Sequence, residues 1–116
     1  MTLFNIKKHY EKFAYPDNFV KILELNLLDY DVWYLMSNEQ VETRINGLKQ
    51  RYSKRKLIPF ARRDDSDDIA CFEEGQGERV FIVHDFASEG FEQRRVYDSF
   101  WEWFKDAIQE MIDYNE

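Results

Sequence analysis

The four-residue run Val80–Val83 is apolar at every position and stands between two polar residues, Arg79 and His84. A strand with one face in water alternates apolar and polar side chains, so a run without alternation indicates a strand that is covered on both faces. We therefore predict a central strand here. Helices must supply one of its covers.

Other β-like runs surround this strand. Two β-like runs precede it, Leu57–Ala61 and Ile69–Phe72. Loops of charged residues and glycine separate these runs from each other and from Arg79–His84, which predicts an antiparallel meander. The run Val32–Met36 is rich in aromatic and β-forming residues and predicts a buried strand upstream. We predict another short strand near Arg94–Tyr97.

Two helices are predicted before the first strand. The first covers Leu3–Ala14, and its apolar side consists of Phe4, Ile6, Tyr10 and Phe13. The second begins at Pro16, because the first helical position tolerates the missing amide hydrogen of proline. Its apolar residues follow at helical spacing and are Phe19, Ile22, Leu23 and Leu27.

Two capping-box signatures mark further helices. Ser37 with Gln40 opens a helix that ends near Tyr52, and its apolar face consists of Val41, Ile45, Leu48 and Tyr52. Ser99 with Glu102 opens a C-terminal helix whose apolar stripe comprises Phe100, Trp103, Phe104, Ala107, Ile108, Met111 and Ile112. The predicted fold class is α+β: an antiparallel meander with N-terminal helices and a C-terminal amphipathic helix packed on it.

The length of 116 residues suits one folding unit, so we expect a single domain over residues 1–116. Lys7, Lys8 and His9 stand where a secretory signal needs apolar residues, and no run approaches the length of a membrane span. The lone cysteine, Cys71, cannot form an internal disulfide, which fits a reducing compartment. We expect a soluble, cytoplasmic protein.

The net charge of −7 is unevenly distributed along the chain. Residues 1–58 carry +3, from ten Lys or Arg against seven Asp or Glu, whereas residues 59–116 carry −10. An acidic surface repels phosphate backbones and anionic lipid headgroups. The charge therefore argues against nucleic acid and membranes as partners and favours a basic protein surface.

The densest polar cluster lies between two predicted strands and consists of Asp64, Asp65, Ser66, Asp67 and Asp68. Crowded carboxylates are typical calcium ligands, and an EF-hand loop needs glycine at its sixth position and glutamate at its twelfth. Counting from Asp64 gives Ile69 and Gly75, and counting from Asp65 gives Ala70 and Gln76, so neither register fits. A solvated hairpin tip and a contact with a basic partner remain as interpretations, with a metal site as the third.

No group of residues indicates catalysis or a bound cofactor. His84-Asp85 at a strand end resembles part of a metal phosphohydrolase site, but such sites need several histidines and the chain has only His9 besides His84. Nucleophile-elbow and glycine-rich phosphate-binding patterns are absent from the sequence. Cys71 lies in a predicted strand and is interpreted as a packed thiol. We predict that the protein is not an enzyme and holds no metal.

A basic group and three tryptophans have two interpretations each. The basic group comprises Arg44, Lys49, Arg51, Lys54, Arg55, Lys56, Arg62 and Arg63. It is interpreted as a solvated helix face, and its charges could instead complement the acidic loop. Among Trp33, Trp101 and Trp103, Trp101 falls off the main apolar stripe and is the candidate for an exposed anchor that contacts a partner.

Several short motifs occur in an order that resembles the SUKH superfamily, which joins the yeast Smi/Knr cell-wall regulators to many small bacterial proteins. These motifs are Tyr15-Pro16-Asp17 at a helix start, the strand Leu57-Ile58-Pro59-Phe60-Ala61, the acidic turn at Asp67-Asp68, the strands Ile69–Phe72 and Val80–His84, and Tyr97-Asp98-Ser99-Phe100 before a helix. Many members carry a glycine-rich turn after the second helix, where this chain has Asp29-Tyr30-Asp31.

The resemblance implies helices around an antiparallel sheet and a binding role. Bacterial members are commonly immunity proteins that neutralise toxin domains, often nucleases, of polymorphic toxin systems, and no member is an established enzyme. The alternative is an intracellular regulatory scaffold of the Smi/Knr type with housekeeping protein partners. The predicted partner-binding residues are Asp64, Asp65, Asp67, Asp68, Glu73, Glu74 and Trp101.

Overall fold

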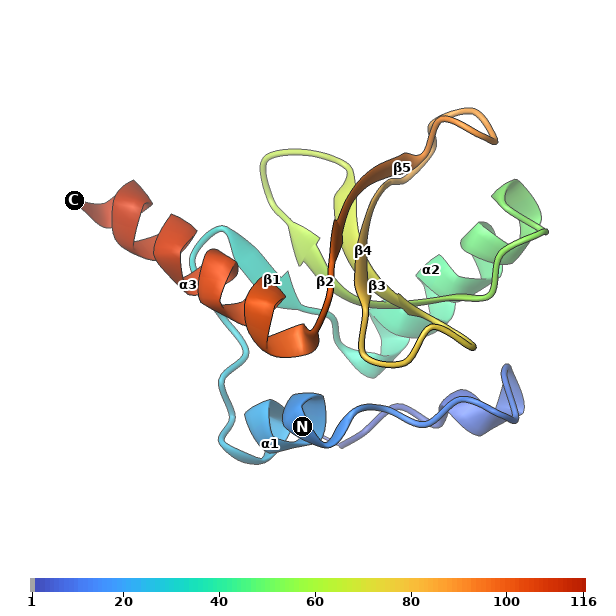
Figure 1. Cartoon of the computed structure of the whole chain (residues 1–116), viewed down its shortest axis with the longest axis horizontal. Helices are drawn as coiled ribbons and strands as arrows, with labels where there is room; N and C mark the ends of the chain where they lie inside the picture. Colours follow the sequence, from blue (N-terminus) through green and yellow to red (C-terminus); the bar gives the residue numbers. More distant parts are fainter. Residues whose placement is uncertain (1) are drawn as a thin grey trace.

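The computed structural model describes residues 2–116 and contains a five-stranded antiparallel sheet with strand order β1-β2-β3-β4-β5 (Figure 1). Along the chain the elements are the 3-10 turn η1 (Ile6–Lys8), α1 (Asp17–Glu24), β1 (Trp33–Leu35), α2 (Asn38–Arg51), β2 (Leu57–Arg63), β3 (Asp68–Glu73), β4 (Val80–His84), β5 (Gln93–Tyr97) and α3 (Phe100–Asn115). The predicted α+β class and the meander are confirmed.

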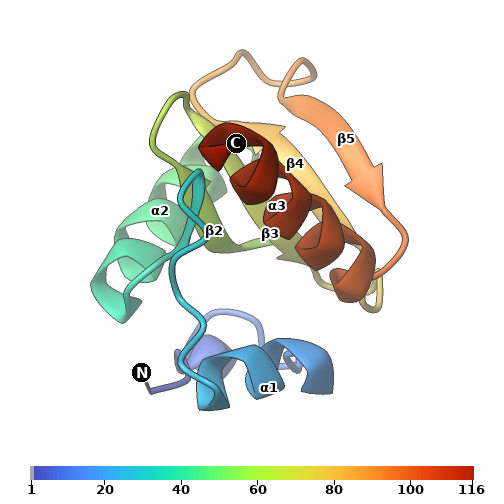
Figure 2. The same ribbon diagram turned by 90° about the vertical axis from the view of Figure 1, so that its left-hand side faces the viewer.

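The strand β4 is covered on both faces, as its sequence predicts. All of Val80–Val83 are buried, and β4 pairs with β3 on one side and β5 on the other. It is an interior strand, although β3 holds the middle position in the sheet. The helices α2 and α3 lie on opposite sides of the curved sheet in Figure 1, and Figure 2 shows α3 crossing one face.

A proline occupies the interior strand β2, where its missing amide hydrogen would ordinarily break the ladder. The register between β2 and β3 shifts between Pro59 and Ala61, so Pro59 lies at a β-bulge. Such irregularities are where an interior strand accommodates proline. The bulge also leaves Phe60 as the extra residue of β2.

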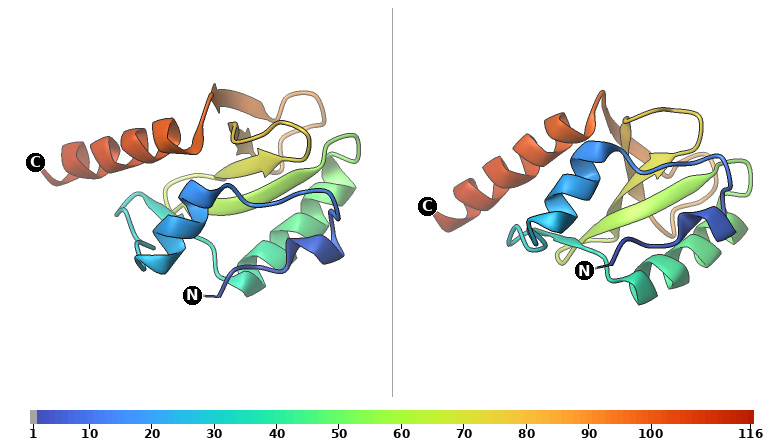
Figure 3. Two further views of the ribbon diagram at one scale, coloured as in Figure 1. Left: turned by 60° about the horizontal axis from the view of Figure 1, so that its bottom comes forward. Right: turned by 90° about the horizontal axis from the view of Figure 1, so that it is seen from below.

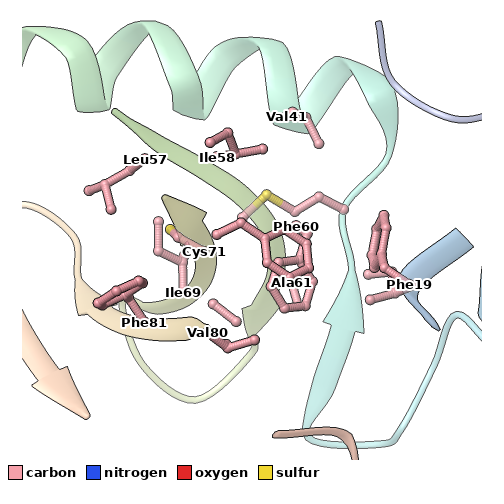
Figure 4. Packing of buried hydrophobic residues seen from close by; sticks show 14 of the residues in the cluster. Phe19, Val41, Leu57, Ile58, Phe60, Ala61, Ile69, Cys71, Val80 and Phe81 are labelled. Atoms are coloured by element: carbon pink, nitrogen blue, oxygen red, sulfur yellow. The ribbon is translucent and has the colours of Figure 1, made fainter. Parts of the chain in front are cut away.

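Phe60 belongs to an aromatic cluster at the centre of the core. Its ring stacks on Phe72 of β3 at 4.5 Å between centroids and meets Trp103 of α3 edge-on at 4.9 Å. Phe19 of α1 approaches Phe60 at 5.3 Å, and Figure 4 shows the two side chains pointing toward each other. Burying each side chain of this size contributes roughly 2–3 kcal/mol to the stability of the fold. Because its members come from the sheet, α1 and α3, the cluster holds these elements together.

The helix predicted over Leu3–Ala14 is wrong, because only η1 forms there. The four predicted apolar residues are all buried, but Phe4 and Ile6 are two positions apart and would point to different sides of a helix. An irregular segment buries both. His9 fixes this segment beside α2, with Nε2 2.6 Å from Glu42 Oε2 and Nδ1 2.8 Å from Lys49 Nζ. Figure 3 shows the N-terminal segment passing along α2 before it reaches α1.

The predicted helix starts are largely correct. Pro16, predicted as the first helical residue, is instead the N-cap of α1, so the helix begins one residue later at Asp17. Leu27 lies beyond the helix and is 41% exposed. This corrects its predicted place on the apolar face, because Asn26 turns into the left-handed region with φ of 59°. The capping box of Ser37 and Gln40 is complete.

The second capping box forms only in part. Ser99 Oγ accepts a hydrogen bond from the Glu102 amide, but the Glu102 carboxylate accepts from the Asp98 amide instead of the Ser99 amide. The apolar stripe of α3 is buried at Phe100, Trp103 and Ala107. It becomes exposed toward the end of the helix, so the last predicted member, Ile112, does not pack in the core.

Candidate functional site

The predicted partner-binding residues do not form one surface. The four aspartates lie at or beside the β2–β3 loop, whereas Glu73 and Glu74 lie at the opposite end of β3. The five steps from Asp68 to Glu73, at about 3.3 Å each, separate the two ends by roughly 17 Å. Trp101 lies in the first turn of α3, 39% exposed, with its ring against Phe104 at 5.6 Å.

Several of these carboxylates are already paired within the protein. Arg63 binds both oxygens of Asp65, at 2.8 and 3.0 Å, and this pairing holds the pKa of Asp65 below its ordinary value despite partial desolvation. Asp68 accepts a hydrogen bond from His84 Nδ1 at 2.9 Å if that nitrogen carries the proton. At the other end of β3, Arg55 binds Glu73 at 2.9 and 3.1 Å.

Two carboxylates that are not predicted from the sequence, Asp29 and Asp31, lie near the β2–β3 loop. The Tyr34 hydroxyl donates to Asp64 Oδ2 at 3.1 Å. This hydrogen bond raises the pKa of Tyr34, with smaller contributions from desolvation and from the negative charges of Asp64, Asp29 and Asp31. Trp33 pairs with Arg63 across β1 and β2, which brings the segment before β1 beside this loop. The two aspartates otherwise look like a break between elements, and no local sequence signal links them to Asp64.

The C-terminal half of α3 completes this surface. Arg63 Nη1 donates to Glu110 Oε2 at 2.8 Å while its other nitrogens hold Asp65, and Asn115 donates to Asp31. We define the acidic end as Asp29, Asp31, Asp64, Asp65 and Glu110. Within residues 2–116, Asp29, Asp31 and Asp64 have no cationic side chain within ion-pair distance. Their charges therefore remain available to a basic partner.

A second charged cluster surrounds Asp85, which directly follows β4 and is fully buried. Arg44 Nη1 donates to Asp85 Oδ2 at 2.7 Å, and Arg51 donates through Nε and Nη2 at 2.8 Å each. The Phe86 amide adds a fourth hydrogen bond at 2.9 Å. Asp85 is thus held by α2, and the expectation of a solvated basic face is wrong for Arg44 and Arg51.

Arg55 forms a third ion-pair cluster that joins β3 to the β4–β5 loop. It binds Glu73 and also Glu92 Oε2, the latter at 3.0 Å. Burial of Glu92 opposes its ionisation, but hydrogen bonds from backbone amides, including that of Gly90, and the Arg55 charge outweigh this and lower its pKa. Four members of the basic group therefore pair with carboxylates outside the β2–β3 loop: Arg44, Arg51, Arg55 and Lys56. Arg63 pairs with Asp65 inside the loop.

The side chains considered for chemistry are engaged in packing and hydrogen bonding. Burial raises the pKa of the Cys71 thiol, which lies inside β3 as predicted. Among the residues that the structure describes, no group of three or more His, Cys, Asp or Glu is placed to hold a metal ion. Over the same residues, no helix is both long and apolar enough to cross a membrane.

Comparison with known protein families identifies the family of this chain. The SMI1/KNR4 family (SUKH-1) matches residues 4–106, which run from the N-terminal segment into α3. The chain belongs to this family. SUKH-1 domains are generally binding or immunity modules rather than enzymes, and the family indicates protein–protein interaction. No curated protein and no solved structure matched the chain.

Proposed function

We propose that this SUKH-1 protein is an immunity protein that binds and neutralises a basic, nuclease-like toxin domain of a polymorphic toxin system in the cytoplasm. The observation that carries the proposal is the acidic end, where three segments far apart in the sequence gather carboxylates. Within residues 2–116, Asp29, Asp31 and Asp64 of this group have no cationic partner. A nuclease attracts phosphate with cationic side chains, and a cluster of carboxylates complements them.

Neutralisation in this proposal is electrostatic and steric. Asp29, Asp31 and Asp64 pair with the cations that would contact the phosphates of the toxin's substrate, and the rest of the acidic end blocks access. Opposite charges accelerate encounter between proteins, and salt screens the attraction beyond about 8 Å at physiological ionic strength. Binding should therefore weaken as salt rises, mainly through a lower association rate.

The test uses the toxin domain encoded beside the gene for this protein and the triple variant Asp29→Asn/Asp31→Asn/Asp64→Asn. Asparagine retains an acceptor oxygen for the local hydrogen bonds, and it tolerates the left-handed conformation of Asp31, whose φ is 68°. We expect the variant to bind about tenfold more weakly, with a smaller salt dependence and less inhibition of the toxin. Biolayer interferometry at several salt concentrations measures both rates.

The matched control is Glu11→Gln/Glu24→Gln/Glu89→Gln, which removes the same charge from exposed positions elsewhere. It should bind within about twofold of the wild type, because these exposed charges lie outside the acidic end and salt screens their effect. Equal affinity of the wild type and the triple aspartate variant would refute the role of the acidic end.

Family membership also supports the second candidate, a regulatory scaffold of the Smi/Knr type. A scaffold predicts several housekeeping partners and no binding to a toxin encoded nearby. Affinity capture from a lysate separates the two candidates, because immunity predicts one dominant toxin domain that the triple aspartate variant loses. Several unrelated partners, held equally by the wild type and the variant, would favour the scaffold.

A further inference from the structure

A surface hollow of about 400 Å³ lies between α2 and β2, and none of the five residues of the acidic end lines it. The first turns of α2 line one side with Gln40, Thr43 and Arg44, and Arg62 of β2 lines the other. Two guanidinium groups thus border one concave space. The rim also carries one carboxylate, Glu39, which is exposed and makes no ion pair with residues 2–116.

Arg62 has no anionic partner within the described chain. Its Nε atom is buried and makes no hydrogen bond, and its guanidinium lies 5.1 Å from the centre of the Tyr34 ring. Placing a cation in a partly buried site without a carboxylate is unfavourable, because burial removes water that nothing replaces. An anionic group entering the hollow would supply the missing partner.

Arg44 connects the hollow to an exposed aromatic ring. While one nitrogen of Arg44 binds Asp85, its guanidinium lies 5.4 Å from the centre of the Phe86 ring, and that of Arg51 lies 4.2 Å away. The Phe86 side chain is 59% exposed although its φ of 71° is unfavourable for a bulky residue. The hydrogen bonds from Arg44 and Arg51 to Asp85 therefore hold the exposed Phe86 ring beside the hollow.

We propose that this surface binds an acidic segment of a partner protein, with a carboxylate between Arg44 and Arg62 and an adjacent apolar side chain on Phe86. The positive charge and the aromatic ring select this occupant together, and arginine and aromatic residues are enriched where protein interfaces concentrate their energy. A nucleic acid would offer phosphate to the arginines, but the net charge of −7 repels a chain of many phosphates far more than a short segment with one carboxylate. The proposal does not rest on immunity function.

The probe is a random peptide library displayed on phage and selected on the wild-type protein alone. We expect selected peptides to carry Asp or Glu beside an apolar residue. In fluorescence polarisation, Arg62→Gln should weaken their binding at least about tenfold, since a hydrogen-bonded charge pair is lost. Arg62→Lys should give an intermediate loss because it keeps the charge without the planar donor pair.

Two further variants separate the contacts from the stability of the fold. Phe86→Gly removes the ring while glycine accepts the φ of 71°, so the loop should keep its shape and the peptides should bind several-fold more weakly. Glu39→Gln removes the carboxylate at the rim and should tighten binding about twofold, as screened surface charges do. A variant that only unfolds the protein cannot produce this gain.

The triple aspartate variant used for the immunity test should bind the selected peptides like the wild type, so the two proposals can fail separately. Peptides without carboxylates, or peptides that bind Arg62→Gln and Phe86→Gly as well as the wild type, would overturn the inference. Binding of a single-stranded oligonucleotide that depends on Arg62 and displaces the peptides would also overturn it, since phosphate would then be the ligand.

Discussion

Arg51 illustrates how one side chain connects two elements through several contacts. It binds Asp85 through two nitrogens, lies over the Phe86 ring, and folds back across Gly47 one turn earlier in α2. Glycine in the middle of a helix is normally unfavourable. Here the Arg51 guanidinium occupies the space beside Gly47, and a Cβ added at Gly47 would lie 2.7 Å from both terminal nitrogens of Arg51.

Gly47→Ala should therefore destabilise the protein, although this substitution usually stabilises a helix by about 1 kcal/mol. The new methyl group displaces the Arg51 guanidinium from Asp85, and charged hydrogen bonds contribute about 2 kcal/mol. We expect a net loss of about 1 kcal/mol in the free energy of unfolding, measured by urea denaturation. In an Arg51→Met background the same substitution should stabilise by about 1 kcal/mol; stabilisation in both backgrounds would show that the contact is unimportant.

Single residues differ in how far their sequence context predicts them. Cys71 is predicted as packed because its strand neighbours are apolar, and it is fully buried. Phe86 follows the same kind of apolar run but is exposed, because α2 anchors the preceding Asp85 from residues more than thirty positions away. Local pattern contains no information about that anchor, so the aromatic ring at the hollow could not be predicted.

At the scale of elements, α2 is the helix that joins most features of the molecule. Its capping box orders the first turn, its inner face packs on the sheet, and its outer arginines hold the β4–β5 loop. The sequence predicts this helix well because capping residues and apolar spacing agree. The helix predicted in the N-terminal segment is wrong, because Ile6, Tyr10 and Phe13 have helical spacing but Phe4 does not. Long-range contacts hold this segment in an irregular conformation instead.

Ser37→Ala should lower the free energy of unfolding by about 1 kcal/mol, the usual effect of losing an N-cap hydrogen bond. The Ser37 hydroxyl accepts from the Gln40 amide at 3.2 Å, and alanine leaves that amide to water. Thermal and urea unfolding measure the change. Ser53→Ala, an exposed serine just beyond α2, is the matched control and should have little effect. Equal stability of the two variants would mean that the cap does not contribute.

At the scale of the whole molecule, ion pairs between distant elements couple stability to pH. The folded state lowers the pKa of Glu92, so this group stabilises the protein above its unfolded pKa of about 4.3, and the stabilisation is lost as pH falls through the folded pKa. Glu92→Gln should be less stable at pH 7 by about 1–3 kcal/mol, since charged hydrogen bonds are lost.

Glu92→Gln should also lose less stability than the wild type as pH falls below about 4.5, because it lacks that titrating group. Urea denaturation at pH 7, 5, 4 and 3 measures both curves. Parallel curves for the two proteins would contradict this coupling. Glu89→Gln removes the same charge from the same loop without breaking an ion pair in the described chain, and it controls for the change in net charge.

The acidic end is also a property of the whole molecule. The acidic character of the β2–β3 loop could be predicted from sequence, because adjacent aspartates are visible there. Its extension to Asp29, Asp31 and Glu110 could not, since β-pairing and the length of α3 bring these residues together. The ion pair with Arg63 partly neutralises the charge of Asp65, and a count of charges in the sequence does not show this.

The irregular N-terminal segment links folding to the direction of protein synthesis. Phe13 packs against Phe72, and His9 contacts Glu42 and Lys49, so residues 2–15 are fixed only by parts of the chain that are made later. Phe72 follows Phe13 by about 60 residues, which takes roughly 3–12 s at about 5–20 residues per second. During that time Phe13 can contact Tyr15 but not Phe72, so its ring stays partly exposed on the nascent chain until β3 has been made.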